Sequence, residues 1–142
     1  MPAADAAPAM ANPANPGMGA RRMAAAPRET GSLESRSASA RQEAVVDFEG
    51  DLAELAPLAT RDRSPEVRLA AVQRLADGET PVARAALRRA LEDDDPDVLV
   101  EAIVAVTTQG DRKSVPALRR LRTHPDEEVR ALAEDALFAL AP

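Results

Sequence analysis

The sequence predicts an all-α protein, an α-solenoid of about three helical hairpins with a disordered N-terminal tail. The first observation is a repeat of 31 residues, which relates Val67, Val98 and Val129. Repeats of this length are typical of helical solenoids, in which each unit buries its apolar face against its neighbours. The second observation is that aromatic residues are 1% of the chain. A core of Leu, Val, Ile and Ala suits closely packed helices better than a sandwich or barrel.

Composition also excludes several classes of protein. The net charge of −6 argues against non-specific nucleic-acid binding, which needs a basic surface. The chain has no Cys, so disulfides and thiolate metal sites are excluded. No apolar run approaches the roughly 20 residues of a membrane-spanning helix. We expect a cytoplasmic protein, or one of the cell envelope if an anchor precedes Met1.

Residues 1–44 are rich in Pro, Ala, Asn, Gly and Ser, and Leu33 is their only branched aliphatic residue. Such a segment buries too little apolar surface to offset the entropy of ordering. We therefore assign 1–44 to a disordered tail or linker and 45–142 to the folded domain. Arg21-Arg22 resembles a twin-arginine motif, but the apolar segment after it is too short for a targeting peptide.

The boundary between tail and domain is expected to be gradual. Residues 35–48 predict a loose helical lead-in, with Val45, Val46 and Phe48 as the first core contacts. The hairpins then cover about 50–77, 78–109 and 110–141.

The first helix of the first hairpin has Leu52, Leu55 and Leu58 on one apolar stripe. Pro57 is expected to bend this helix, since its ring removes one backbone hydrogen bond locally. Thr80 and Asp111, also 31 residues apart, are expected to start the first helices of the next two hairpins.

The second helix of each hairpin begins with a cap, at Ser64, Asp95 and Asp126. A side-chain oxygen at this position accepts a hydrogen bond from a free amide of the first turn. Pro follows the cap in the first two copies, where its missing amide costs nothing. Acidic residues complete each first turn and complement the helix dipole.

The segment Val98–Val106 is rich in β-branched residues and has the composition of a buried strand. The cap at Asp95 and the 31-residue register favour a helix instead. Its apolar character on nearly all sides is expected of the middle unit, which is packed on both flanks. An apolar docking patch at Leu99 and Val100 is the alternative reading.

The pattern of a cap, Pro, an acidic residue, Val-Arg, two Ala and Leu resembles HEAT repeats in their short bacterial, phycobilisome-lyase-like form. The best copy runs from Ser64 to Leu75, and Val129 to Leu137 follows it, while the middle copy has Leu99 where Arg is usual. The resemblance covers about residues 50–141. Because such repeats mostly bind other proteins, the resemblance implies a protein-binding module. The same fold hosts unrelated roles, so the resemblance is specific for the fold and weak for the function.

Known enzymatic relatives can be tested against the residues. HEAT-repeat iron hydroxylases use His-Glu pairs, whereas this chain has the single histidine His124, which cannot build a metal site alone. Asp93, Asp95 and Asp97 have the spacing of a calcium loop, but Val98 and Val104 replace the required Gly and Glu. The aromatic residues expected around a tetrapyrrole, and the basic aromatic groove of HEAT-like DNA glycosylases, are also missing. We expect no enzyme, cofactor or metal site.

In HEAT stacks the second helices line the concave face, and the resemblance places the candidate partner-binding residues there. They are Arg68, Gln73, Arg74, Glu101, Thr108, Arg130 and Glu134. A structural role is favoured for Arg68 and Arg130, because arginines at this family position often bond acidic residues of an adjoining turn, here among Asp62, Asp93, Asp94 and Asp126. A second series of arginines on the first helices is expected to be solvated or, alternatively, to meet an acidic partner: Arg88, Arg89, Arg119, Arg120 and Arg122.

The last helix carries Leu132, Phe138 and Leu140 and has no polar capping unit after it. A partner or a second copy could dock on this C-terminal flank. The sequence therefore favours a non-enzymatic interaction module or scaffold. An accessory of pigment attachment and a self-associating structural module are the alternatives.

Overall fold

The computed structural model describes residues 36–142, and Ser37–Pro142 form one compact unit. The unit is built from helices, and no strand occurs among the described residues, so the all-α prediction is confirmed. The helices, with two 3₁₀ turns, are α2 (Ala38–Val46), η5 (Leu52–Leu55), α3 (Ala56–Arg61), α4 (Pro65–Leu75), α5 (Pro81–Ala90), α6 (Pro96–Thr108), η6 (Arg112–Ser114), α7 (Val115–Leu121) and α8 (Glu127–Ala139). Most of the expected tail, residues 1–35, lies outside the described residues.

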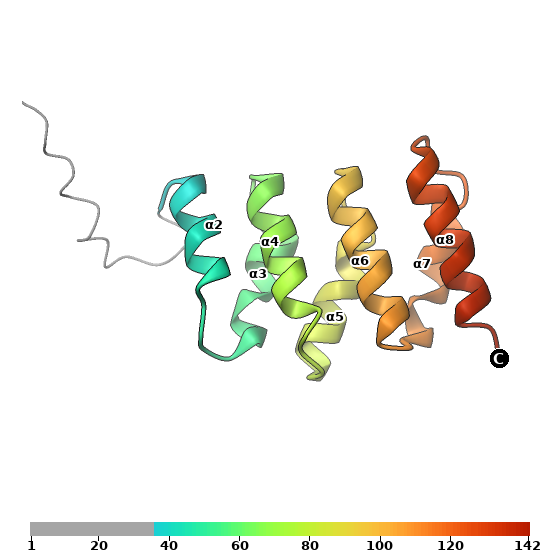
Figure 1. Ribbon diagram of the computed structural model, residues 1–142, viewed down its shortest axis with the longest axis horizontal. Coiled ribbons are helices and arrows are strands. Elements are labelled where there is room, and N and C mark those ends of the chain that lie inside the picture. The colour runs from blue at the N-terminus through green and yellow to red at the C-terminus, as the bar shows by residue number, and fades with distance from the viewer. Residues whose placement is uncertain (1–35) are drawn as a thin grey trace, which may run out of the picture. The chain divides into compact units, whose positions relative to one another are not determined.

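The helices form two layers (Figure 1). We call the row of α2, α4, α6 and α8 the α4 layer, and the row of α3, α5 and α7, with η5 and η6, the α5 layer. Within the α4 layer each helix packs on the next, and each α5-layer helix packs on a helix of the α4 layer. This is the stacked-hairpin arrangement that the 31-residue repeat predicts.

Two first helices begin as 3₁₀ turns. Asp51 caps η5 through the amide of Ala53, and α3 follows with Pro57 in its first turn. Asp111 likewise caps η6 through the amide of Lys113. The expected bend at Pro57 thus takes the form of a change from 3₁₀ to α-helix, which spares the backbone bond that Pro cannot make.

The second helices begin where the sequence predicts. The Ser64 hydroxyl and the Asp95 and Asp126 carboxylates each accept a bond from an amide of the first turn. Val98–Val106 is helical within α6, and Val98, Ile103 and Val106 are buried there. A helix with both flanks covered needs no polar stripe, which explains its strand-like composition.

Helix α2 is a fourth copy of the second-helix pattern, shorter in spacing than the other three. Its cap Ser37 lies 27 residues before Ser64, and at this spacing Arg41 matches Arg68 and Val45 matches Val72. The compact unit therefore begins at Ser37 rather than at residue 45. The helix has little aliphatic content, so hydrophobic periodicity indicates a loose lead-in there and does not identify a repeat copy.

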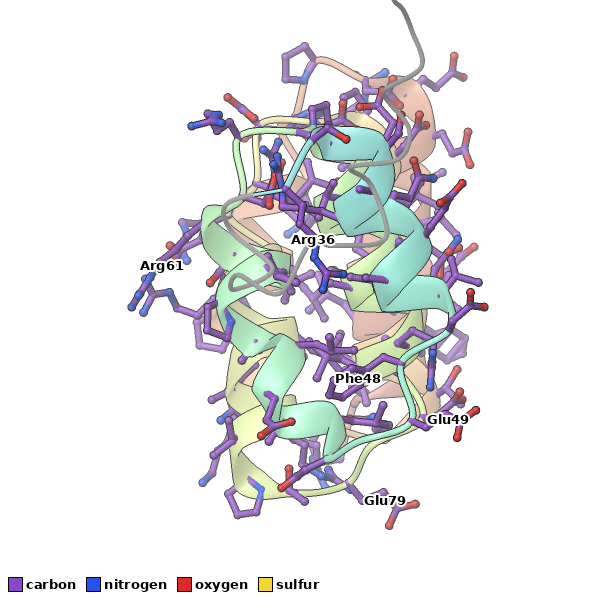
Figure 2. All side chains as sticks on the ribbon, turned by 90° about the vertical axis from the view of Figure 1, so that its left-hand side faces the viewer. Arg36, Phe48, Glu49, Arg61 and Glu79 are labelled. Carbon is purple, nitrogen blue, oxygen red and sulfur yellow. The ribbon has the colours of Figure 1, made fainter. Side chains whose placement is uncertain are left out.

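The expected first core contacts divide into three kinds. Val45 is fully buried, whereas Val46 is 59% exposed. Phe48 is half-buried and lies between the two layers in the view from the α2 end (Figure 2). Val45 and Val46 are adjacent on a helix and point in different directions, so only one of them can face α4.

The C-terminal flank is partly covered by its own chain. Leu140 is buried and Leu132 is half-buried, but Phe138 is 82% exposed. A cavity of about 650 Å³ opens between α7 and α8, and its wall includes Val115, Leu137 and Leu140.

Candidate interaction surfaces

Buried arginine–aspartate pairs join successive second helices to the turns of the next hairpin. Arg41 of α2 donates to both carboxylate oxygens of Asp62, at 2.7 and 2.9 Å. Arg68 of α4 makes the same two-pronged contact with Asp93, at 2.7 and 3.0 Å. The structural role favoured for Arg68 is therefore its observed one, while Arg41 was missed because its spacing departs from 31.

The aspartate of each pair also organises its own turn. Asp62 accepts the amide of Ser64 at 2.9 Å, and Asp93 accepts the amide of Asp95 at 2.9 Å. Burial by itself would raise the pKa of Asp62, but its hydrogen bonds from Arg41 and Ser64 outweigh burial and lower that pKa. The bond to Asp93 raises the pKa of Arg68. The first pair thus stabilises the charged forms of both of its partners, Arg41 and Asp62.

The third step of this ladder has neither the arginine nor the aspartate. Leu99 occupies the arginine position and is fully buried, and His124 occupies the aspartate position. His124 Nδ1 accepts the amide of Asp126 at 3.0 Å, so the histidine keeps the turn-forming contact without the carboxylate. Leu99 replaces the guanidinium and His124 replaces the carboxylate at one and the same step of the repeat. The two departures from the repeat pattern therefore go together.

Arg130 stands at the last arginine position. Its Nη1 donates to the carbonyls of His124 and Pro125, at 2.8 and 2.9 Å. Arg68 makes the equivalent Nη1 bond to the Asp62 carbonyl at 2.7 Å and uses its other edge for Asp93. Within residues 36–142 the corresponding edge of Arg130 has no carboxylate partner.

Arg74 holds the end of α2. It donates to the carbonyls of Val45, Val46 and Phe48, at 2.8, 2.6 and 2.6 Å. Val45 and Val46 belong to the last turn of α2, where carbonyls lack intrahelical partners, and Phe48 follows the helix. Arg74 thus ties the C-terminus of α2 to α4. The sequence analysis did not predict this structural role for Arg74.

The remaining candidate residues are less committed. Gln73 of α4 donates to Glu101 of α6 at 3.5 Å, which brings these two candidates together. Thr108 is exposed at the end of α6, and exposed Glu134 lies 3.7 Å from Arg122. The structure therefore does not bring all seven candidates into one cluster.

Several contacts between hairpins escaped the sequence analysis. Gln109 donates to the carbonyls of Ala76 and Gly78, both at 2.9 Å. Arg88 pairs with buried Asp111 at 2.6 Å. Val104, an exposed apolar side chain of the α4 layer, was also not put forward as a partner contact; its exposure depends on how α6 is rotated.

The acidic turn between α5 and α6 is used structurally. Asp93 holds Arg68, and Asp95 caps α6 through the amides of Asp97 and Val98. The side chain of Asp94 is 97% exposed. Over residues 36–142, no group of three or more His, Cys, Asp or Glu side chains is arranged to hold a metal ion. In the same part of the chain, no helix is long and apolar enough to cross a membrane.

Stacked hairpins tied by an arginine ladder define an α-solenoid of helical repeats. A sequence profile of the family described as HEAT repeats matches residues 52–137, which is more than half of the chain. The chain belongs to the HEAT repeat family. No curated protein and no solved structure shows significant similarity to it.

Proposed function

We propose that this HEAT repeat chain is a non-enzymatic protein-binding module or scaffold that takes its partner on the α4 layer. HEAT repeats commonly mediate protein–protein interaction. The observation that supports the α4 layer as the binding surface is that its four arginines are already engaged within the chain. Arg41 and Arg68 hold aspartates, and Arg74 and Arg130 hold backbone carbonyls.

With these arginines engaged, the layer offers a partner mainly carboxylates and a few apolar side chains. Its helices carry eight Asp and Glu residues against those four arginines. Val104 is 46% exposed on α6, and Gln73 occupies the same repeat position on α4. A partner segment with basic and aliphatic side chains fits this combination, because unlike charges give specificity and buried apolar groups give affinity.

Of the candidate residues, Gln73, Glu101, Thr108 and Glu134 are proposed as direct partner contacts. Arg68 and Arg74 act on the partner only by holding the helices in place. Arg130 is proposed to do both, since one edge of its guanidinium is bonded to carbonyls.

The test is affinity capture from the source cell, with the full chain as bait and mass spectrometry as readout. The variant Val104→Asp/Glu101→Lys changes the proposed surface without touching the arginine ladder. Val82→Asp/Glu92→Lys is the matched control, because Val82 is 52% exposed at the start of α5 and Glu92 is exposed just after its end, both in the other layer.

Proteins captured by the wild type and by the control, but lost with the Val104→Asp/Glu101→Lys variant, support the proposal. Equal capture by both variants contradicts it. Circular dichroism of each variant checks that the helices remain folded.

A second candidate function is self-association through the C-terminal flank, favoured by the 82% exposure of Phe138 and the open edge of Arg130. A large exposed aromatic side chain is a frequent interface residue. Sedimentation should then give a mass that rises with concentration, and Phe138→Ser should abolish the rise. A wild-type chain that stays monomeric at high concentration contradicts this candidate.

A further inference from the structure

The α5 layer carries a strong positive charge, although the whole chain is acidic. Its helices and 3₁₀ turns hold eight cationic residues against one carboxylate, that of Glu54. The cationic residues are Arg61, Arg84, Arg88, Arg89, Arg112, Lys113, Arg119 and Arg120. The two layers of the solenoid therefore differ in sign.

Most of these cations are not neutralised within the described chain. Arg88 pairs with Asp111 at 2.6 Å, and Arg120 lies 3.6 Å from Glu92. None of the other six forms an ion pair with a carboxylate of residues 36–142. Figure 2 shows Arg61 directed away from α2, on the outer side of α3. Cations gathered on one face repel one another, so a carboxylate-rich partner is favoured there.

Two adjoining grooves run between the helices of this face. The first, of about 260 Å³, lies between α3 and α5, and its floor includes Pro57, Val82 and Ala86. The second, of about 370 Å³, lies between α5 and the start of α7, and its floor includes Pro116 and Ala117. Ala85 and Arg89 of α5 line both grooves.

The side chains around the grooves divide by chemistry. Small apolar groups form the floors, and Val82 is 52% exposed within the first groove. The cations in the lining are Arg61 and Arg89 in the first groove, and Arg88, Arg89, Lys113 and Arg120 in the second. The second groove also contains one carboxylate, that of Glu92, which lies 3.6 Å from Arg120. The part of α5 that lines both grooves thus combines a small apolar side chain, Ala85, with a cation, Arg89.

We propose that these two grooves form a docking surface for an acidic protein segment that carries aliphatic side chains. Its carboxylates pair with Arg61, Arg89 and Lys113, and its aliphatic groups cover Val82 and Ala85. A nucleic acid fits this surface less well, because the face offers no aromatic side chain for base stacking and its methyl-lined floors give phosphates nothing to bind. This surface lies on the opposite layer from the proposed partner site and does not depend on it.

The experiment measures binding of a fluorescein-labelled peptide of about 16 residues that alternates Glu pairs with Leu or Ala. As a helix this peptide spans roughly 24 Å, and three neighbouring helices packed 8–10 Å apart span roughly 20 Å. Fluorescence anisotropy with the full chain is read at about 0.1 M salt, where the Debye length of about 10 Å screens the acidic α4 layer. We expect a Kd below about 1 mM that weakens as salt rises.

The variant Arg61→Glu/Arg89→Glu reverses two charges at the grooves and should weaken the peptide about tenfold or more. The matched control is Arg112→Glu/Arg122→Glu. It makes the same change in net charge at two exposed residues that line the C-terminal cavity instead. The control should lose less than about threefold.

Three results would overturn the proposal. One is absence of binding by the wild type at this salt concentration. Another is equal loss in the groove variant and its control. The third is that oligothymidylate displaces the peptide and binds more tightly, which would make the face a nucleic-acid site. A version of the peptide with Lys in place of Glu should not bind the α5 layer. If this Lys peptide binds the wild type and Arg61→Glu/Arg89→Glu equally well, its binding is assigned to the acidic α4 layer.

Discussion

Replacing Arg68 by leucine tests whether the ladder stabilises the stack. In the wild type both edges of the guanidinium are used: Asp93 takes two bonds and the Asp62 carbonyl takes a third. The side chains of Arg68 and Asp93 are 13% and 7% exposed. Arg68→Leu leaves the Asp93 carboxylate in place without its cation, and breaking a buried pair in this way costs about 3 kcal/mol of unfolding free energy.

The chain itself contains the compensating change. In the next step of the ladder Leu99 and His124 take the repeat positions of Arg68 and Asp93, and His124 still accepts the turn amide at 3.0 Å. We therefore expect Asp93→His alone to cost about 2 kcal/mol, but Arg68→Leu/Asp93→His to cost only about 1–2 kcal/mol in total. The coupling energy in this double-mutant cycle should be about 3 kcal/mol.

Urea and thermal unfolding followed by circular dichroism measure these differences. For a domain of this size, 1 kcal/mol corresponds to about 4–8 °C in Tm, so Arg68→Leu should lower Tm by about 12 °C or more. Arg89→Leu is the control, because Arg89 lies on α5, away from the ladder, and makes no ion pair within the described residues; it should change Tm by little. If the double variant loses the sum of the two single losses, the Leu–His pair does not replace the Arg–Asp pair and this reasoning fails.

Three further predictions concern other contacts. The pKa of Asp62 is lowered in the folded state, so the stability that its carboxylate contributes is complete above the unfolded pKa of about 3.9 and is lost as pH falls further. Asp62→Asn should therefore lower Tm at neutral pH and reduce the fall of Tm at acid pH. An unchanged fall of Tm at acid pH would contradict this prediction. Arg74→Ala removes three bonds to the end of α2 and should cost about 1–3 kcal/mol, with faster hydrogen exchange confined to α2; uniform exchange changes would show that Arg74 does not act locally. Gly110 has φ of +65° with nothing within 4 Å of an added Cβ. Gly110→Ala should therefore lower the free energy of unfolding by about 1 kcal/mol through backbone strain alone, and Gly110→Asn should lower it less. Equal stability of the wild type and both variants in urea would refute this.

Much of the fold could be predicted because its determinants are local. The caps at Ser64, Asp95 and Asp126 act on amides two or three residues away, so a short stretch of sequence contains both partners. The 31-residue register adds three consistent copies of this local pattern. The same reasoning predicted only a loose helical lead-in where α2 lies and did not identify α2 as a repeat copy, since its spacing is 27 residues and its helix is held by Arg41 rather than by an aliphatic stripe.

The candidate site was less predictable because it depends on contacts between hairpins. The sequence placed Arg68 and Arg74 among the partner-binding candidates and, of these two, favoured a structural role only for Arg68. Arg74 reaches carbonyls 26–29 residues away, a contact that no local pattern encodes. Exposure of Val104 and burial of Leu99 in one apolar helix also follow from rotation against neighbouring helices.

By itself, therefore, the sequence determined the helical class, the hairpin boundaries and the family resemblance. Propensity, caps and periodicity act within one or two helical turns, and each repeat restates them. Only the tertiary structure decided which charges are consumed by the stack and which remain for a partner. Packing directs one set of arginines inward to aspartates and carbonyls and leaves the other set around the grooves of the α5 layer.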